Sequence, residues 1–248
     1  MWAEARALGE IEEYTGPVTR ALPMVLSARE KPTFPDPEQA DDRGLVAVGG
    51  VVAPEWLLAA YARGIFPWYD QGLPPLWWSP NPRAILDGER LHVSRSMERV
   101  LKQARFRVSF DTAFEAVMRA CGDERDEGTW ILPEMISAYV ELHRRGHAHS
   151  FEVWDGERLV GGLYGVQLGG FFAAESMFHR STNASKVALI CAVRSLFGAG
   201  VGLFDVQFLT PHLSSLGAHV IPRSAYLSRL EQARQLPVSL EGLNPSDR

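Results

Sequence analysis

Residues 149–178 read HSFEVWDGERLVGGLYGVQLGGFFAAESMF. His149–Trp154 and Arg158–Leu168 are both rich in β-branched and aromatic residues, which is typical of strands. They are separated by Asp155-Gly156, a pair that favours a tight hairpin turn. Gly169-Gly170 leads into a further apolar run that ends near Met177. The pattern predicts an antiparallel meander of three strands.

The chain after the meander predicts helices that alternate with a strand. Asn183 or Ser185 is suited to cap a helix that runs to Phe197, Val201–Phe208 has the composition of a buried strand, and Arg223–Gln235 predicts a final helix. This order indicates an α+β fold with a mixed sheet. It looks like the acyl-CoA N-acetyltransferase fold.

The whole chain is divided into three parts. Residues 1–32 are an acidic extension that we expect to be peripheral, 33–110 a small N-terminal domain, and 111–248 a larger C-terminal domain that contains the meander. The local patterns predict a strand at Leu45–Val48, a helix from Pro54 to Arg63, a loop from Ile65 to Pro82, a helix at Ser94–Ala104, a strand at Phe106–Phe110, a helix capped by Asp111 that runs to Ala120, and a helix from Leu132-Pro133 to Gly146.

Composition indicates an ordinary globular protein. Of the 248 residues, 46% are hydrophobic and 22% are charged, which argues against a disordered chain. The cysteines, Cys121 and Cys191, form neither a disulfide framework nor a metal cluster, so a reducing compartment is favoured. The start is too acidic for a secretory signal, and no apolar run reaches the roughly 18 residues of a membrane span. We expect a cytoplasmic monomer without contact to a membrane.

A basic helix stands out within a chain of net charge −5. Arg95, Arg99 and Lys102 are spaced at i, i+4 and i+7, which places them on one helical face. The face can simply be solvated, or it can bind the phosphates of a nucleic acid. Both interpretations stay open at this point.

Tryptophans are concentrated in the proline-rich segment 65–82, where Trp68, Trp77 and Trp78 lie, and Trp130 follows later in the chain. Large apolar rings are unusual in such connections and need to be covered. They can belong to the core, or they can stack on the bases of a single-stranded nucleic-acid end.

Polar residues interrupt two strands that are otherwise apolar. Asp205 and Gln207 share one face of the late strand, and Glu175 lies within the third strand of the meander. Buried polar groups need partners. Asp205 and Gln207 therefore form either a satisfied structural network or a pair that orients a nucleophilic amine. Glu175 can pair with an internal arginine, or it can bind a cationic group of a substrate.

Other chemistries have little support. His147 and His149 can share a strand face, but without a nearby third ligand we interpret them as structural and expect no metal site. Neither Ser214 nor Ser215 lies in a G-x-S-x-G elbow, and the sequence holds no phosphate-binding loop and no dinucleotide fingerprint. We expect no cofactor.

Eight motifs, in order and with matching spacing from about Phe34 to Leu230, resemble those of bacterial leucyl/phenylalanyl-tRNA–protein transferases. They are Gly64–Trp68, Trp77–Arg83, Glu127–Ile131, Gly146–Ser150, Glu175–Phe178, Asn183–Lys186, Asp205–Gln207 and Ser215–Ala218.

This resemblance implies an aminoacyltransferase with a small N-terminal domain and a C-terminal acetyltransferase-like domain that does not use acetyl-CoA. Its partners would be Leu-tRNA and Phe-tRNA as donors, and proteins with N-terminal Arg or Lys as acceptors. Leu would be transferred to the acceptor's α-amine, as would Phe and, less readily, Met. The product would be a degradation signal of the bacterial N-degron pathway.

The resemblance also implies roles for individual residues. Asp205 and Gln207 would be catalytic, and Glu175 and Thr210 would bind the acceptor. The aminoacyl-adenosine end would be bound by Trp68, Trp130, Phe172 and Ser215, and the donor side chain would lie in a pocket formed by Leu163, Met177, Leu189, Ala192 and Leu196. The tRNA would be bound by Arg95, Arg99 and Lys102. Some family members carry Met at position 163, Phe at 192 and 196, and Asn at 210.

The aminoacyl ester is already activated, so that the enzyme needs to supply placement, a neutral amine and stabilisation of the developing oxyanion. We hypothesise that the Gln207 side-chain oxygen accepts a hydrogen bond from the amine, and that Asp205 orients Gln207 or takes up the proton. An acetyl-CoA-dependent acyltransferase and a non-catalytic RNA-binding module are the alternatives. The first lacks a glycine-rich loop at Arg180–Ser185, and the second leaves Asp205, Gln207 and Glu175 unexplained.

Overall fold

The structure is a computed structural model that describes residues 23–103, 105–123 and 129–245. Within these ranges the main element is a seven-stranded sheet with the order β11-β5-β10-β9-β8-β7-β6. Its strands are β5 (Arg83–Ile85), β6 (Arg107–Phe110), β7 (Ala148–Asp155), β8 (Arg158–Leu168), β9 (Phe171–His179), β10 (Leu203–Gln207) and β11 (His219–Ile221). Glu127 and Gly128, the start of one quoted motif, lie outside the described residues.

The predicted meander is confirmed. β7, β8 and β9 are successive antiparallel neighbours. The chain then forms α6 (Ala184–Gly198) and returns as β10, which pairs with β9 in parallel. The sheet is therefore mixed, and the α+β class is confirmed. Parallel neighbours need a crossover connection, which α6 supplies here.

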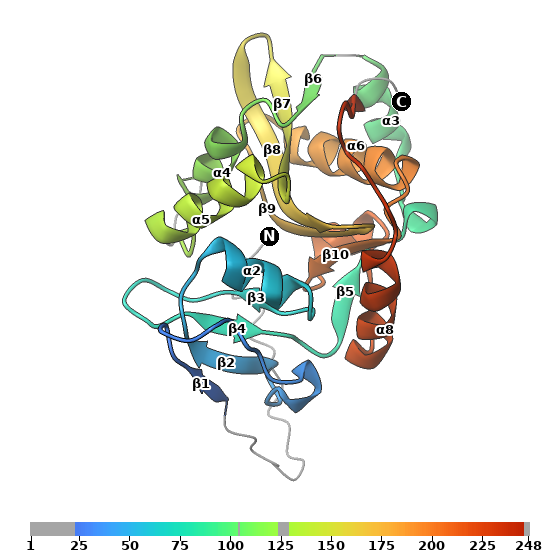
Figure 1. Ribbon diagram of the computed structural model, residues 1–248. Coiled ribbons are helices and arrows are strands. Elements are labelled where there is room, and N and C mark those ends of the chain that lie inside the picture. The colour runs from blue at the N-terminus through green and yellow to red at the C-terminus, as the bar shows by residue number, and fades with distance from the viewer. Residues whose placement is uncertain (1–22, 104, 124–128, 246–248) are drawn as a thin grey trace.

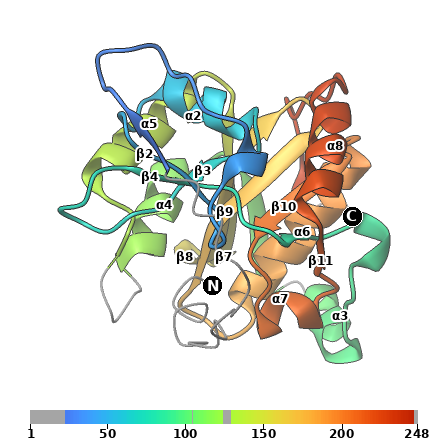
Figure 2. The same ribbon diagram turned by 90° about the horizontal axis from the view of Figure 1, so that it is seen from below.

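Helices cover both faces of the meander. Figures 1 and 2 show α4 (Phe114–Asp123) and α5 (Pro133–Arg144) on one side of β7–β9 and α6 on the opposite side. Two separate hydrophobic clusters correspond to these two faces. Phe171 and Ala173 of β9 belong to the cluster on the α4–α5 side, whereas Phe172 and Ala174 belong to the cluster on the α6 side, as strand alternation requires.

A smaller sheet lies below the meander in Figure 1, next to α2 (Pro54–Tyr61). Its strand order is β1-β2-β4-β3, formed by β1 (Met24–Leu26), β2 (Leu45–Gly49), β3 (Phe66–Pro67) and β4 (Leu76–Trp78). The predicted loop from Ile65 to Pro82 was therefore wrong. Trp77 is fully buried beside the rings of Phe34 and Trp56, and Pro67 is tolerated because β3 is an edge strand.

The two sheets do not follow the expected division at residue 110. β5 and β6 precede that residue and still lie in the seven-stranded sheet, together with strands that follow it. β1 lies within the predicted extension 1–32 and pairs in parallel with β2. Residues 1–22 of that extension are outside the described part of the chain. The boundaries at 32 and 110 remain proposals.

Two capping predictions need correction. Asp111 does not cap α4, which begins at Phe114. Instead, its carboxylate accepts hydrogen bonds from Ser150 N and from the ring of His149, so that it ties β6 to β7. Asn183 does occupy the N-cap position of α6, but it has a left-handed φ of 71° and its side chain makes no capping hydrogen bond.

The remaining elements are helices. They are the 3-10 helices η1 (Pro37–Gln39) and η2 (Gly88–Arg90), and the α-helices α3 (Arg95–Lys102), α7 (Pro211–Ser215) and α8 (Arg223–Arg234). α3 and α8 were predicted, although Ala104, the expected end of α3, is not described. No helix within the described ranges is both long and apolar enough to cross a bilayer.

Candidate active site

The candidate site lies where β9 and β10 separate. The parallel pairing of these strands ends at Ala173 and Asp205, whereas β9 continues to His179. Glu175 lies just beyond the last pair and is the extra residue of a β-bulge, because its two neighbours face consecutive residues of β8. Bulges redirect side chains and are frequent beside active sites.

A second irregularity occurs on β10 at the same level of the sheet. Asp205 faces Ile85 of β5 and Gln207 faces Ala84, so that two steps on β10 correspond to one step on β5. Gln207 also has a φ of 58°, which is rare for a residue with a side chain. Such a conformation costs about 1–3 kcal/mol and persists only where the surroundings impose it.

Asp205 is completely buried and accepts four hydrogen bonds. Its Oδ1 accepts from Arg83 Nε at 2.9 Å and from the backbone N–H of Gln207 at 2.9 Å. Its Oδ2 accepts from Arg83 Nη2 at 2.7 Å and from the Tyr226 hydroxyl at 2.8 Å. The carboxylate thus joins β5, β10 and α8, and it restrains the unusual backbone of Gln207.

Arg83 compensates the buried charge of Asp205. Its guanidinium carbon lies 4.8 Å from the centroid of the Phe66 ring and 4.5 Å from that of the Tyr226 ring, and the group also donates to the carbonyl of Gly64 at 3.1 Å. Burial acts to lower the pKa of Arg83, but the neighbouring charge of Asp205 acts against it, and the pKa is raised overall. Arg83 therefore stays charged in a position closed to solvent.

Glu175 and Gln207 meet across the gap. Gln207 Nε2 donates to Glu175 Oε1 at 3.2 Å, and Tyr139 donates to Glu175 Oε2 at 3.5 Å, while the hydroxyls of Tyr139 and Tyr61 are 2.6 Å apart. Burial raises the pKa of Glu175 to about 8. A hydrogen bond from Tyr61 lowers this pKa in part, whereas the nearby charge of Asp205 adds to the rise. At neutral pH the carboxyl group is mostly protonated.

One acceptor atom of this network has no partner among the residues that the structure describes. Gln207 Oε1 is buried and receives no hydrogen bond from the described residues. Burying an amide oxygen without a donor is costly. In a protein site, such an atom is suited to accept a hydrogen bond from a bound molecule.

The structure brings the three candidate polar residues together. Asp205, Gln207 and Glu175 form one continuous hydrogen-bonded chain, and all three side chains are buried. Trp68 lies near them, because its ring is 6.1 Å from that of Phe208, the residue after Gln207. Trp68 and Phe208 are half-buried, so that these rings form the more accessible edge of the site.

The residues predicted to hold the donor side chain also gather in one place. Leu163, Leu189, Ala192 and Leu196 are fully buried in the cluster on the α6 side of the sheet, and Met177 packs against it from a half-buried position. Phe172 belongs to the same cluster, where it stacks on Phe204 at 5.5 Å. Their role in donor binding stays a prediction.

Three other predicted residues lie outside the strands of the sheet. Trp130 is buried on the α4–α5 side of the sheet. Thr210 caps α7, with its Oγ1 accepting from Leu213 N at 3.2 Å. Ser215 is exposed at the end of α7 and donates to the carbonyl of His212 at 2.7 Å. Their roles likewise stay predictions.

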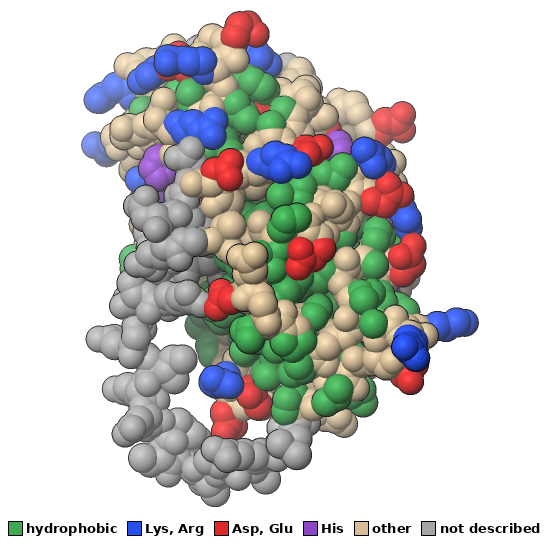
Figure 3. Space-filling view, turned by 90° about the vertical axis from the view of Figure 1, so that its left-hand side faces the viewer, with side chains coloured by type: hydrophobic (Ala, Val, Ile, Leu, Met, Phe, Trp, Pro, Cys, Tyr) green, Lys and Arg blue, Asp and Glu red, His purple; other side chains and the backbone are tan. Residues whose placement is uncertain are grey.

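The predicted basic face is present on α3. Arg95, Arg99 and Lys102 are exposed, and Glu98 is engaged by Arg194 of α6 at 2.8 Å instead of neutralising them. Positive charge is also unevenly distributed over the side of the molecule that Figure 3 shows. Most of the Lys and Arg side chains visible there lie toward the top of the view. Whether α3 binds tRNA stays a prediction.

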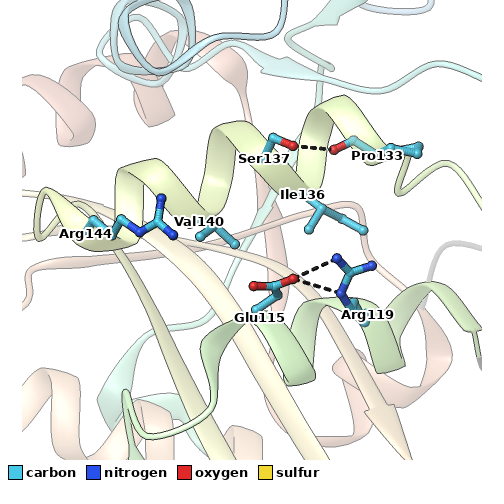
Figure 4. A pocket seen from close by; sticks show the side chains of 7 residues that line it. All are labelled: Glu115, Arg119, Pro133, Ile136, Ser137, Val140 and Arg144. Carbon is cyan, nitrogen blue, oxygen red and sulfur yellow. Dashed lines mark hydrogen bonds and ion pairs between the residues drawn. The ribbon is translucent and has the colours of Figure 1, made fainter.

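A separate hollow lies between α4 and α5. It measures about 310 Å³, and Figure 4 shows apolar Ile136 and Val140 beside the ion pair of Glu115 and Arg119. Arg119 is committed to Glu115 at 2.7 Å, which leaves little free charge for a ligand. This hollow holds none of the residues predicted for catalysis.

Sequence reasoning missed the partners that hold the site. Arg83 was part of a quoted motif without an assigned role, and Tyr61, Tyr139 and Tyr226 were not singled out at all. The only local signal for Arg83 was a charged residue directly before an apolar run, Ala84–Leu86. The tyrosines come from helices, and nothing local indicates that their hydroxyls point inward.

The histidines have structural contacts. His149 Nδ1 is 2.7 Å from Asp111 Oδ2, and His143 Nδ1 is 2.8 Å from the carbonyl oxygen of Ala148. Across the described residues, no group of three or more His, Cys, Asp or Glu side chains is arranged to hold a metal ion.

Comparison with known proteins gives a consistent relationship. The family model "Leucyl/phenylalanyl-tRNA protein transferase" matches residues 85–231, and the model of the N-terminal domain of the same family matches residues 50–81. Leucyl/phenylalanyl-tRNA–protein transferases from Anaeromyxobacter sp. (strain Fw109-5) and Legionella pneumophila (strain Corby) are 54% and 50% identical. Each match covers 83% of this chain. It covers 88% of the Anaeromyxobacter protein and 93% of the Legionella protein.

Likenesses to solved structures are weaker. A GCN5-related N-acetyltransferase from Kribbella flavida has a TM-score of 0.37 at 12% identity, over 67% of this chain and 59% of that chain. L-PGS from Bacillus licheniformis has the same TM-score and identity. That match covers 64% of this chain and 54% of the L-PGS chain. The family models and the relatives at 50–54% identity decide the assignment. This chain, an α+β aminoacyltransferase with a small N-terminal domain, belongs to the leucyl/phenylalanyl-tRNA–protein transferase family.

Proposed function

We propose that this protein transfers Leu, also Phe and less readily Met, from aminoacyl-tRNA to the α-amine of proteins that begin with Arg or Lys. The modified proteins would thereby gain an apolar N-terminal residue that marks them for degradation. Aminoacyl-tRNA and new proteins are both cytoplasmic, so the cytoplasm is the proposed location. The names of the relatives support tRNA as donor and protein as acceptor.

The observation that carries the proposal is the unpartnered oxygen of Gln207. Gln207 Oε1 is buried beside Glu175 at the separation of β9 and β10. An incoming amine can donate a hydrogen bond to this oxygen and direct its lone pair at the ester carbonyl carbon. The half-buried ring of Trp68 is suited to stack on the terminal adenine of the tRNA.

The proposed reaction is an aminolysis. The amine nitrogen forms a bond to the carbonyl carbon, the bond from that carbon to the ribose oxygen breaks, and a proton from the amine passes to the departing ribose oxygen. The ester supplies the driving force, so that correct placement of the amine accounts for much of the acceleration. A covalent enzyme intermediate is not required.

Glu175 is proposed to recognise the acceptor's basic side chain. A guanidinium or ammonium group beside the carboxyl stabilises its ionised form, which counteracts the effect of burial on its pKa. The resulting charge-assisted hydrogen bonds are roughly twice as strong as neutral ones. A neutral side chain would leave Glu175 protonated and would gain no such contact.

The test is a transfer assay with radiolabelled Leu-tRNA. We expect label in a peptide that begins with Arg or Lys, and little label in the same peptide beginning with Gly. An N-acetylated arginyl peptide is the control, because it keeps the basic side chain but lacks the α-amine. Equal labelling of the Arg and Gly peptides would contradict the proposed acceptor, and labelling from acetyl-CoA instead of Leu-tRNA would contradict the proposed donor.

A further inference from the structure

Arg83 is held more tightly than an ordinary structural arginine requires. Its side chain is 1% exposed, and all three of its nitrogens donate hydrogen bonds. Two of those bonds reach Asp205 in the bidentate geometry that only a guanidinium group offers. The rings of Phe66 and Tyr226 lie 4.8 and 4.5 Å from its guanidinium carbon. The orientation of Asp205 is therefore fixed by Arg83.

Asp205 in turn has no acceptor position left for a proton. A carboxylate offers about four lone-pair positions. Arg83 occupies two of them, the Tyr226 hydroxyl a third, and the backbone N–H of Gln207 the fourth. A general base needs a free lone pair directed at the proton that it removes. Asp205 does not meet this requirement.

The fourth bond is the one that reaches the candidate site. It holds the N–H of Gln207, whose φ of 58° would relax without such a restraint. The backbone orientation of Gln207 determines where its side-chain amide lies, and that amide meets Glu175. A continuous path of contacts thus runs from Arg83 through Asp205 to the unpartnered Gln207 Oε1.

We propose that Arg83 is a positioning residue for aminoacyl transfer, which holds Asp205 as a clamp on the backbone of Gln207. Asp205 then serves as a hydrogen-bond acceptor and does not serve as the base. This inference rests on the proposed function, in which Gln207 Oε1 orients the amine. Misplacement of a catalytic group by about 1 Å can cost roughly 100-fold in rate.

The test is a double-mutant cycle that combines Arg83→Lys with Gln207→Ala, read out by the steady-state kcat and KM of Leu transfer to an arginyl peptide. Lys keeps the positive charge but cannot bind both carboxylate oxygens in the same geometry. We expect Arg83→Lys to lower kcat by roughly 10- to 100-fold, with little change in KM for Leu-tRNA. In the Gln207→Ala protein, Arg83→Lys should lower kcat by less than about twofold, because its effect passes through Gln207.

Arg223→Lys provides the matched control. Arg223 is also a buried arginine, which donates to Ser79 O at 2.7 Å and to Glu38 at 3.4 Å, and we expect Arg223→Lys to leave kcat unchanged. Tyr226→Phe is the milder second variant, should Arg83→Lys fail to fold. It removes one hydroxyl from Asp205 and should lower kcat a few-fold, again only while Gln207 is present.

The outcomes separate the two proposals. Wild-type kcat in both Arg83→Lys and Tyr226→Phe, or equal losses with and without Gln207, would overturn the role of Arg83 while leaving the proposed function intact. Absence of Leu transfer by the wild-type protein would overturn the proposed function itself, whereas full activity of Gln207→Ala would overturn the role of Gln207 and with it that of Arg83. A loss of kcat in Arg83→Lys that depends on Gln207 supports the inference.

Discussion

Gln207 Nε2 lies 3.2 Å from Glu175 Oε1, and this hydrogen bond closes the gap between β9 and β10 just beyond their last paired residues. Each of the two residues lies at an irregularity of its strand. The contact therefore joins two side chains that a regular sheet would not direct in this way. It also leaves Gln207 Oε1 as the free acceptor of the site.

Substitution Glu175→Gln tests acceptor recognition. Gln keeps the size of the side chain and an oxygen that can accept from Gln207 Nε2, but it cannot become a carboxylate. We expect KM for an arginyl peptide to rise by roughly 10- to 100-fold, since a hydrogen bond to a charged group contributes about 1.5–3 kcal/mol. Steady-state assays with varied peptide measure this effect.

Glu141→Gln is the control for that substitution. Glu141 is a half-buried acid of α5 that pairs with Arg145 at 2.9 Å, and its replacement should leave KM unchanged. The acceptor role of Glu175 would be contradicted by an unchanged KM in Glu175→Gln. A fall in kcat alone would instead assign Glu175 to the positioning of Gln207.

The raised pKa of Glu175 predicts a pH dependence of stability. The pKa of Glu175 is about 8 in the folded protein, mainly because of burial, and the usual value is 4.5. The charge of Asp205 adds to the rise, whereas the hydrogen bonds from Tyr61 and Tyr139 and the charge of Arg83 oppose it. Between these pH values the folded state binds one proton more than the unfolded state, so the free energy of unfolding falls as pH rises. The contribution is complete below about pH 4.5 and lost above about pH 8.

Glu175→Gln removes this titration. Relative to wild type, the variant should gain more than about 1 kcal/mol of stability between pH 5 and pH 9, because one pKa unit corresponds to 1.36 kcal/mol. Urea unfolding of both proteins at pH 5, 7 and 9 measures the difference. A stability difference that is constant with pH would mean that Glu175 is ionised throughout this range.

The exposed face of α3 predicts a salt-dependent contact with tRNA. The double substitution of Arg95 and Lys102 by Ala should weaken Leu-tRNA binding several-fold and make the salt dependence shallower, by about 0.7–0.9 in log–log slope per lost phosphate contact. Binding measured at 50–200 mM salt gives the slope. Arg144→Ala, which removes an exposed arginine from α5, should leave it unchanged. An unaltered slope in the α3 variant would exclude this face from the tRNA contact.

Local patterns predicted most of the larger sheet. β7, β8 and β9 alternate or run apolar over eight or more residues and are joined by glycine-containing turns, so that their sequence signal is strong. β5 and β11 have three residues each and were missed. β3 and β4 were hidden by the prolines around them. Such strands form because of tertiary pairing and burial, which a single sequence does not display.

The candidate site was predictable only in part. Glu175, Asp205 and Gln207 were visible as polar residues within apolar strands. Arg83 was not, because it is 122 positions from Asp205 in the chain and the pair forms only when β5 joins β10. The sequence also did not indicate the left-handed backbone of Gln207, because glutamine, unlike glycine or asparagine, has no marked preference for a positive φ.

The most direct measurement is the single-turnover rate of Leu transfer from Leu-tRNA to an arginyl peptide by Gln207→Ala, compared with the wild-type protein. If the buried amide oxygen directs the attacking amine, the rate falls by about 100-fold or more while Leu-tRNA binding and the unfolding midpoint stay close to wild type. If Gln207→Ala transfers Leu at the wild-type rate, the amide oxygen has no part in the reaction.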